Sequence, residues 1–159
     1  MAIEKGDLTC VLSTCTKIIA QVSCVTNILQ GATGCMEIQF FGKDGLPLDI
    51  DRFTEIQILL YNELDCGIIN FWHPAVPSGK TGAIIDVLQT LNAGIYTKKG
   101  LVKICLSKTC TATSPANIFA EIRLTELVSG KEEIYGISCL NVAKILESKI
   151  HKNINTNCE

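Results

Sequence analysis

The first thirty residues combine a regular apolar repeat with an almost complete lack of charge. From Leu8 to Leu29, apolar residues recur at alternating spacings of three and four, which is the heptad spacing of a helical seam. The residues on this spacing are Leu8, Val11, Cys15, Ile18, Val22, Val25 and Leu29. Between Leu8 and Met36 the only charged side chain is Lys17, whereas a solvated helix normally carries charge on its outer face. The pattern predicts an N-terminal helix surrounded by protein, most simply by copies of itself.

The expected helix has Asp7 as a suitable N-cap and Gly31 just beyond its end. β-Branched residues occupy both seam positions, at Ile18, Val22 and Val25, which favours trimers or tetramers over dimers. Two alternatives stay open. The first is a strand, because the stretch is rich in weak helix formers and alternates locally between apolar and polar residues. The second is a single helix packed on its own domain, which would also have uncharged flanks.

From Cys35 onward, short apolar runs alternate with polar turns, which is typical of strands. Seven strands are expected, near residues 35–41, 55–61, 68–72, 83–88, 100–106, 117–124 and 131–140. A tight turn is predicted over 42–45, an irregular loop over 73–82 and a further turn over 91–94. The apolar spacing in 141–150 suits a helix but also a longer last strand. Short strands without a βα rhythm predict a mainly β, antiparallel sandwich.

The chain is thus expected to have three parts. Residues 1–33 form the helix for oligomerisation or docking, residues 34–150 the β-sandwich, and residues 151–159 a polar tail. The net charge of −2 argues against a general nucleic-acid surface, and no run of 18 apolar residues marks a membrane span. Polar residues between Ser13 and Lys17 interrupt what would be the apolar part of a signal peptide.

Nine cysteines are many for 159 residues, and the number is odd. They are Cys10, Cys15, Cys24, Cys35, Cys66, Cys105, Cys110, Cys139 and Cys158. A secreted disulfide framework favours an even number at closer spacing, and zinc sites favour C-x2-C pairs with histidine partners. The closest spacing here is C-x4-C, and both histidines are isolated. No metal or cofactor is predicted, and the cysteines are interpreted as small buried apolar residues of a protein folded in a reducing cytoplasm.

The candidate catalytic motifs are incomplete. The segment 78–81 ends like a phosphate-binding loop, but Pro74 stands where the pattern needs glycine, five residues before Gly79. No cysteine or serine has a histidine and an acid at a recognisable spacing, so nucleophilic catalysis is not indicated. The paired carboxylates Asp49 and Asp51 are expected to be solvated at a turn. We therefore do not expect an enzyme.

The only tryptophan, Trp72, lies at the end of an expected strand. Large aromatic side chains are mostly buried, so Trp72 is expected to anchor the sandwich core. The alternative is an exposed aromatic surface that binds sugars, built from Trp72, Tyr61 or Tyr96. This alternative would make the chain a carbohydrate-binding module.

Four stretches share the layout of a known family: Phe41–Asp51, Thr54–Tyr61, Leu91–Ile104 and Ile118–Leu124. The first contains Gly45, Pro47 and Asp49 in a turn that leads into a strand. Over roughly residues 36–142 the chain resembles the immunoglobulin-like modules of bacteriophage structural proteins. These include the N-terminal domains of baseplate upper proteins and head-fibre proteins, in particular a small head fibre of crAss-like phages.

The resemblance implies an immunoglobulin-like sandwich in a non-enzymatic virion component, namely a head fibre, decoration or adaptor protein. Such proteins commonly form trimers that dock by one end on the particle. The implied partners are two further copies of the chain and capsid, tail or other virion proteins, without nucleic acid or membrane, and the seam from Leu8 to Leu29 would form the oligomer interface. The implied location is the virion, after folding in the reducing cytoplasm of the bacterial host. The chain departs from the family in its many cysteines and in lacking a long fibre shaft.

Overall fold

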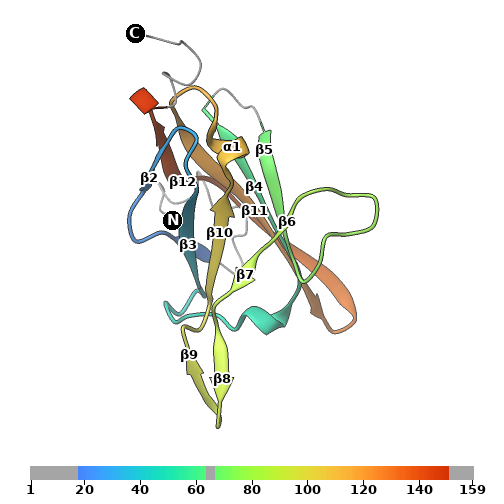
Figure 1. Cartoon of the computed structure of the whole chain (residues 1–159). Helices are drawn as coiled ribbons and strands as arrows, with labels where there is room; N and C mark the ends of the chain where they lie inside the picture. Colours follow the sequence, from blue (N-terminus) through green and yellow to red (C-terminus); the bar gives the residue numbers. More distant parts are fainter. Residues whose placement is uncertain (1–17, 64–66, 151–159) are drawn as a thin grey trace, which may run out of the picture.

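Two β-sheets share one apolar core in the computed structural model, which describes residues 18–63 and 67–150 (Figure 1). The four-stranded sheet contains, in spatial order, β1 (Ile19–Gln21), β3 (Gly34–Phe41), β10 (Leu101–Leu106) and β7 (Asp86–Val87). The six-stranded sheet contains β2 (Thr26–Leu29), β12 (Lys131–Leu146), β11 (Ala116–Val128), β4 (Phe53–Asn62), β5 (Gly67–His73) and β6 (Ala83–Ile84). The expected mainly β class is therefore confirmed.

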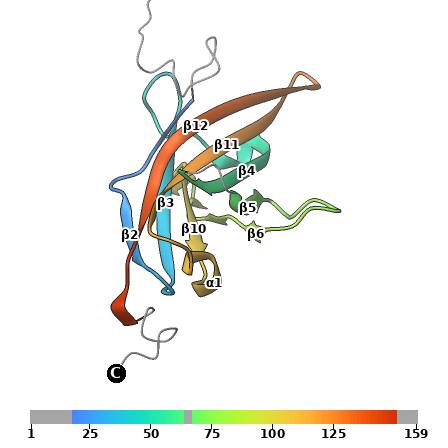
Figure 2. The same ribbon diagram turned by 90° about the horizontal axis from the view of Figure 1, so that it is seen from above.

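The six-stranded sheet is mixed, which corrects the prediction of a purely antiparallel fold. Strand β2 runs parallel to β12, and β5 runs parallel to β6, while the other pairs in this sheet are antiparallel. Figure 2 shows the long strands β11 and β12 curving together. Register shifts interrupt their pairing near Phe119 and Ile122, and such bulges bend and twist a strand pair.

The predicted helix is wrong over residues 18–30, which form strands β1 and β2. Strand β1 pairs with β3 in one sheet and β2 pairs with β12 in the other, so this segment crosses between the two sheets. The heptad spacing misled because Val, Ile and Thr are restricted at χ1 and pack well on a pleated sheet. Strand preference and burial therefore outweighed the apolar repeat.

The predicted seam residues lie in different surroundings. Leu8, Val11 and Cys15 lie outside the described residues. Ile18 is buried in the core and Val22 packs against it, whereas Val25 and Leu29 are exposed. Their role in an oligomer interface stays a prediction, now without the helix that motivated it.

Alternate residues of the central strands fill the core, as the sequence pattern predicted. Ile56, Ile58 and Leu60 of β4 are fully buried, as are Ile118 and Ile122 of β11. Their neighbours along each strand point to the outer face. At about 1.5–3 kcal/mol for each fully buried large aliphatic side chain, this alternation is the main source of cohesion between the sheets.

Three expected segments differ in detail. Residues 83–88 form two short strands, β6 and β7, one in each sheet, with Ile85 buried between them. The expected turn over 91–94 lies within a separate hairpin, β8 (Thr90–Asn92) and β9 (Ile95–Thr97). The last strand extends to Leu146, which settles the choice left open for its C-terminal part. Two short helical turns, η2 (Ile50–Arg52) and α1 (Lys108–Thr111), complete the elements.

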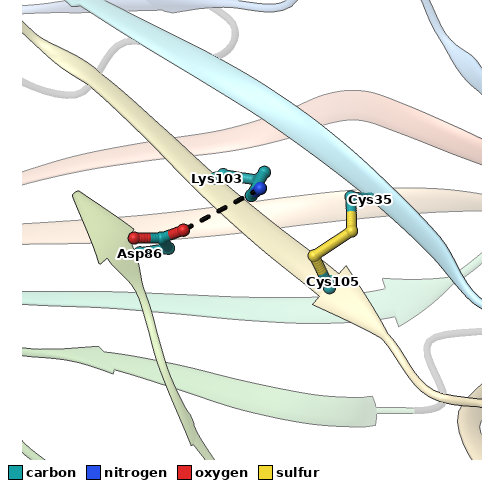
Figure 3. The surroundings of a disulfide bond; sticks show 4 residues. All are labelled: Cys35, Asp86, Lys103 and Cys105. Atoms are coloured by element: carbon teal, nitrogen blue, oxygen red, sulfur yellow. Dashed lines mark ion pairs between the residues drawn. A yellow bond between two sulfur atoms is a disulfide. The ribbon is translucent and has the colours of Figure 1, made fainter. Parts of the chain in front are cut away.

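Most of the described cysteines are not small buried core residues, contrary to expectation; Cys110 is half-buried and packs against the core. Cys35 of β3 and Cys105 of β10 lie opposite each other and form a disulfide on the exposed face of the four-stranded sheet (Figure 3). The other described cysteines carry free thiols that are exposed or half-buried: Cys24, Cys110 and Cys139. The disulfide therefore ties together two strands that are 70 residues apart in sequence.

Candidate functional site

Three connections meet at one end of the two-sheet body, which is the lower end in Figure 1. They are residues 42–52 between β3 and β4, residues 88–100 between β7 and β10, and the turn at Ser129 and Gly130 between β11 and β12. We call this region the loop end. The β8–β9 hairpin, which lies within residues 88–100, pairs with neither of the two large sheets and forms a two-stranded sheet of its own.

Asp49, the N-cap of η2, fixes the base of the hairpin. Its carboxylate accepts hydrogen bonds from the backbone N–H of Asp51 at 3.0 Å, from Gln89 Nε2 at 2.8 Å and from the Tyr96 hydroxyl at 2.5 Å. Gln89 Oε1 in turn accepts from the backbone N–H groups of Ile50 and Gly100. The expectation that Asp49 is simply solvated is therefore wrong.

The electrostatics of this cluster favour a charged Asp49. Partial burial raises its pKa, but the hydrogen bonds from Tyr96, Asp51 and Gln89 and the nearby charge of Lys99 outweigh burial, so the net pKa lies below its usual range. The hydrogen bond to Asp49 raises the pKa of Tyr96. At neutral pH, Asp49 is therefore ionised and Tyr96 protonated, which makes their contact a charge-assisted hydrogen bond.

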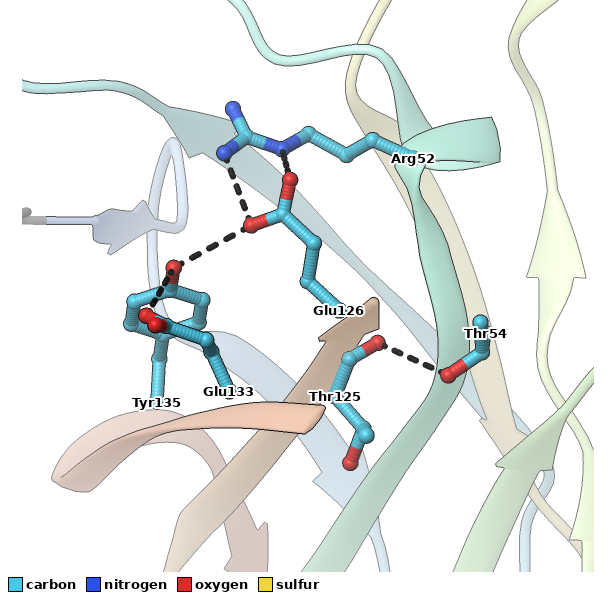
Figure 4. A network of polar contacts seen from close by, with 6 residues as sticks. All are labelled: Arg52, Thr54, Thr125, Glu126, Glu133 and Tyr135. Atoms are coloured by element: carbon cyan, nitrogen blue, oxygen red, sulfur yellow. Dashed lines mark hydrogen bonds and ion pairs between the residues drawn. The ribbon is translucent and has the colours of Figure 1, made fainter. Parts of the chain in front are cut away.

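Arg52, at the other end of η2, fixes the β11–β12 hairpin (Figure 4). Its Nε and Nη2 donate to the two carboxylate oxygens of Glu126, each at 2.9 Å, in a bidentate ion pair. The Tyr135 hydroxyl lies 3.1 Å from Glu126 and 3.4 Å from Glu133. The hydrogen bond with Glu126 raises the pKa of Arg52. The turn η2, together with its N-cap Asp49, thus links residues 42–52 both to the β8–β9 hairpin and to the β11–β12 hairpin.

This hydrogen-bonded frame carries exposed apolar side chains. Of the eleven large hydrophobic residues exposed in the described chain, three lie in these connections, namely Leu46, Leu91 and Ile95. Three more lie on β11 and β12 beside the turn that joins them: Leu127, Val128 and Ile134. Leu91 and Ile95, on the β8–β9 hairpin, are 58% and 69% exposed. Exposed apolar side chains on a fixed frame are typical of an interaction surface, because ordering them costs little further entropy on binding.

The aromatic residues considered for sugar binding lie in three separate surroundings. Trp72 is buried, at 5% exposure, but it does not anchor the sandwich core as predicted. Its ring lies under the 77–82 loop on the outer face, and its Nε1 donates to the carbonyl of Thr81. Tyr96 is held by Asp49, and the Tyr61 ring packs against Phe119. They therefore do not form one aromatic platform.

The residues of the loop end were missed from the sequence, apart from Asp49 and Tyr96, which were considered for other roles. The sequence held one weak sign of an exposed apolar hairpin. Leu91 and Ile95 flank a short turn, and the residues around them lack the apolar alternation of a buried strand. The phosphate-loop resemblance of 78–81 does not have the necessary context, since strand β6 and not a helix follows it.

Three further results bear on function. Within residues 18–63 and 67–150, no three His, Cys, Asp or Glu side chains are grouped to hold a metal ion. The same residues include no helix with the length and apolar character needed to cross a membrane. No protein-family model matches the chain, and no curated protein sequence matches it.

Proposed function

We propose that the chain is a non-enzymatic, immunoglobulin-like module that binds another protein through its loop end. The observation that carries this proposal is the group of exposed apolar side chains on a frame held by Asp49 and Arg52. An isolated two-stranded hairpin is marginal in water, so an anchored hairpin with Leu91 and Ile95 outward is better explained by a binding role.

The strand order supports the immunoglobulin-like part of the proposal. The order β1-β3-β10-β7 corresponds to strands A-B-E-D of a variable-type domain. The order β12-β11-β4-β5-β6 corresponds to G-F-C-C′-C″, with β2 as an added edge strand beside G. In this correspondence, residues 42–52 and the turn between β11 and β12 are the B–C and F–G loops, which bind ligands in antibody variable domains.

We further propose that the partner is a capsid or tail protein of a phage particle, as the sequence resemblance implies. In this role the module would be a head fibre, decoration or adaptor protein. Trimerisation remains part of the proposal only through that resemblance, because residues 18–30 do not form the helix that supported it.

The interface is expected to depend on a few side chains. Leu91 and Ile95 lie on opposite faces of the hairpin, since Leu91 pairs with Tyr96 and Ile95 with Asn92. The partner would therefore have to cover both faces of the hairpin, and each fully buried aliphatic side chain contributes roughly 1.5–3 kcal/mol. Interfaces typically have a few such dominant residues, surrounded by contacts of little energetic effect. Removing both side chains should therefore abolish stable docking.

Particle assembly tests the proposal. Phage particles would be produced with the gene encoding either the wild type, the Leu91→Ser/Ile95→Ser variant or the control Ile84→Ser, and the protein in purified particles would be quantified by immunoblotting. Ile84 is 52% exposed but lies on β6, away from the loop end. We expect the double variant to fold but to be missing from particles, while the control is incorporated.

Two results would contradict the proposal. Absence of the wild-type protein from particles would refute the virion role. Normal incorporation of the double variant would refute docking through the loop end. Light scattering on the purified chain would separately test the trimer.

A further inference from the structure

A polar groove lies on the outer face of the six-stranded sheet, apart from the loop-end frame. Its volume is about 530 Å³, within the range of roughly 300–1,000 Å³ that is usual for small-molecule sites. Its polar lining comes from three strands and one loop: Glu55, Gln57, Asn70, Lys80, Thr81 and Arg123. The proposed docking function uses none of these residues.

Three of these side chains, from neighbouring strands, form a diagonal row. Arg123 of β11 lies directly opposite Gln57 of β4. Asn70 of β5 is opposite Leu59 and so lies one diagonal step from Gln57. Gln57 Nε2 donates to Asn70 Oδ1 on β5 at 2.8 Å. Glu55 lies two residues before Gln57 and so points to the same face. Paired strands hold the row, so its spacing does not depend on a flexible loop.

The wall of the groove is also fixed. Trp72 lies beneath it, and its indole N–H donates to the Thr81 carbonyl at 2.9 Å. Gly82 has a φ of +139°, and a Cβ there would come within 2.3 Å of the Asn70 carbonyl oxygen. The loop therefore packs directly on β5, and Lys80 and Thr81 stand at the side of the row.

Much of the hydrogen-bonding capacity in this row is unused within the described residues. The contact between Gln57 and Asn70 leaves Gln57 Oε1 as an acceptor and Asn70 Nδ2 as a donor. Neither Glu55 nor Arg123 has an ion pair or a side-chain hydrogen bond in the described chain. Acceptors and donors thus lie side by side in the groove, next to a guanidinium group that forms no ion pair within the described residues.

We propose that this groove binds a carboxylated saccharide. The Arg123 guanidinium would hold the carboxylate in a bidentate pair, with Lys80 adding a second positive charge. Neighbouring sugar hydroxyls both donate and accept, which matches Glu55 and Gln57 Oε1 as acceptors and Asn70 Nδ2 as a donor. The single carboxylate of Glu55 disfavours multiply charged phosphates. Because the Trp72 ring is covered, stacking is absent and affinity for one sugar is weak.

An NMR titration of the 15N-labelled full chain tests this site. The probe is sodium D-glucuronate, and D-glucose is the matched control, since it has the same ring hydroxyls without the carboxylate. For a ligand of this size, we expect a Kd on the order of 1 mM, with shifts of the side-chain amide signals of Gln57 and Asn70. Glucose should bind about tenfold more weakly or worse, because it lacks a hydrogen bond to a charged group.

Two variants that each remove one positive charge test whether glucuronate binds in this groove. Arg123→Gln should weaken glucuronate binding about tenfold or more, whereas Lys131→Gln, at the start of β12, should leave it unchanged. Both side chains are exposed, and the amide spectrum of each variant reports directly on its fold. Three results would overturn the proposal: no glucuronate-dependent shifts at Gln57 and Asn70, equal binding of glucose, or unchanged binding by the folded Arg123→Gln variant.

Discussion

Replacing Cys35 and Cys105 by serine measures how much the cross-strand disulfide contributes to stability. The disulfide closes a loop with a sequence separation of 70. The chain-entropy relation gives a loss of about 15 cal/mol/K in the unfolded state for such a loop, or about 4 kcal/mol at 25 °C. Both side chains are exposed, so serine removes little packing. Since native disulfides often contribute less than this relation gives, we expect a loss of about 2–4 kcal/mol.

Urea unfolding provides the assay. Trp72 is the only tryptophan and is buried, so its fluorescence should report the loss of the folded state. The wild type would be unfolded with and without a phosphine reductant, and the double serine variant would be treated in the same way. We expect the reductant to lower the wild-type midpoint and to increase the slope, because the reduced unfolded chain exposes more surface. The reduced wild type should then resemble the variant.

The variant also controls for the other thiols. Its own midpoint should not change with reductant, because the cross-link is already absent. A wild-type curve unaffected by reductant, together with a variant as stable as the wild type, would refute the reasoning. A loss of about 2–4 kcal/mol is a large part of the 5–15 kcal/mol by which domains are usually stable.

Three further predictions concern the loop end and its anchors. Gly100→Ala should cost about 2–3 kcal/mol, because φ is +80° and a Cβ would lie 2.8 Å from the backbone carbonyl oxygens of Phe40 and Leu48. Gly130→Ala, at φ +81° in open space, should cost about 1 kcal/mol, and equal losses of stability in thermal melts would contradict the close approach at Gly100. The pKa of Asp49 is lower in the folded protein than its ordinary value of 3.8. The ionised carboxylate should therefore stabilise the fold above pH 3.8, and this contribution should be lost as the pH falls through the pKa of Asp49 in the folded protein. The stability difference between wild type and Asp49→Asn should shrink over that acid range, and a constant difference would refute this. A double-mutant cycle of Arg52→Gln and Glu126→Gln should give a coupling of about 0.5–1 kcal/mol that falls with added salt, and a coupling of zero would contradict a formed ion pair.

The positions of the main strands could be predicted from the sequence. Alternation identified the main strands because each has one face in the core, as Ile56, Ile58 and Leu60 show. It did not reveal that residues 18–30 cross between sheets, because partner strands far away in sequence decide that arrangement. The same limit applied to the loop end, where Asp49 and Tyr96 are 47 positions apart and meet only after the sheets have formed. No local spacing encodes such a contact.

The pairing of β2 with β12 has a consequence for synthesis of the chain. Thr26 lies beside Ala143, so β2, an early strand of the described part of the chain, needs β12, the last of the described strands, as its partner. During translation, the β2 segment must therefore remain unpaired in this sheet until β12 has left the ribosome. Long-range closure of this kind is slow, and unpaired strand edges are prone to aggregate. The β2 segment should consequently be where a chaperone binds the nascent protein for longest, and shielding it should improve the yield of folded protein more than shielding β4 or β5.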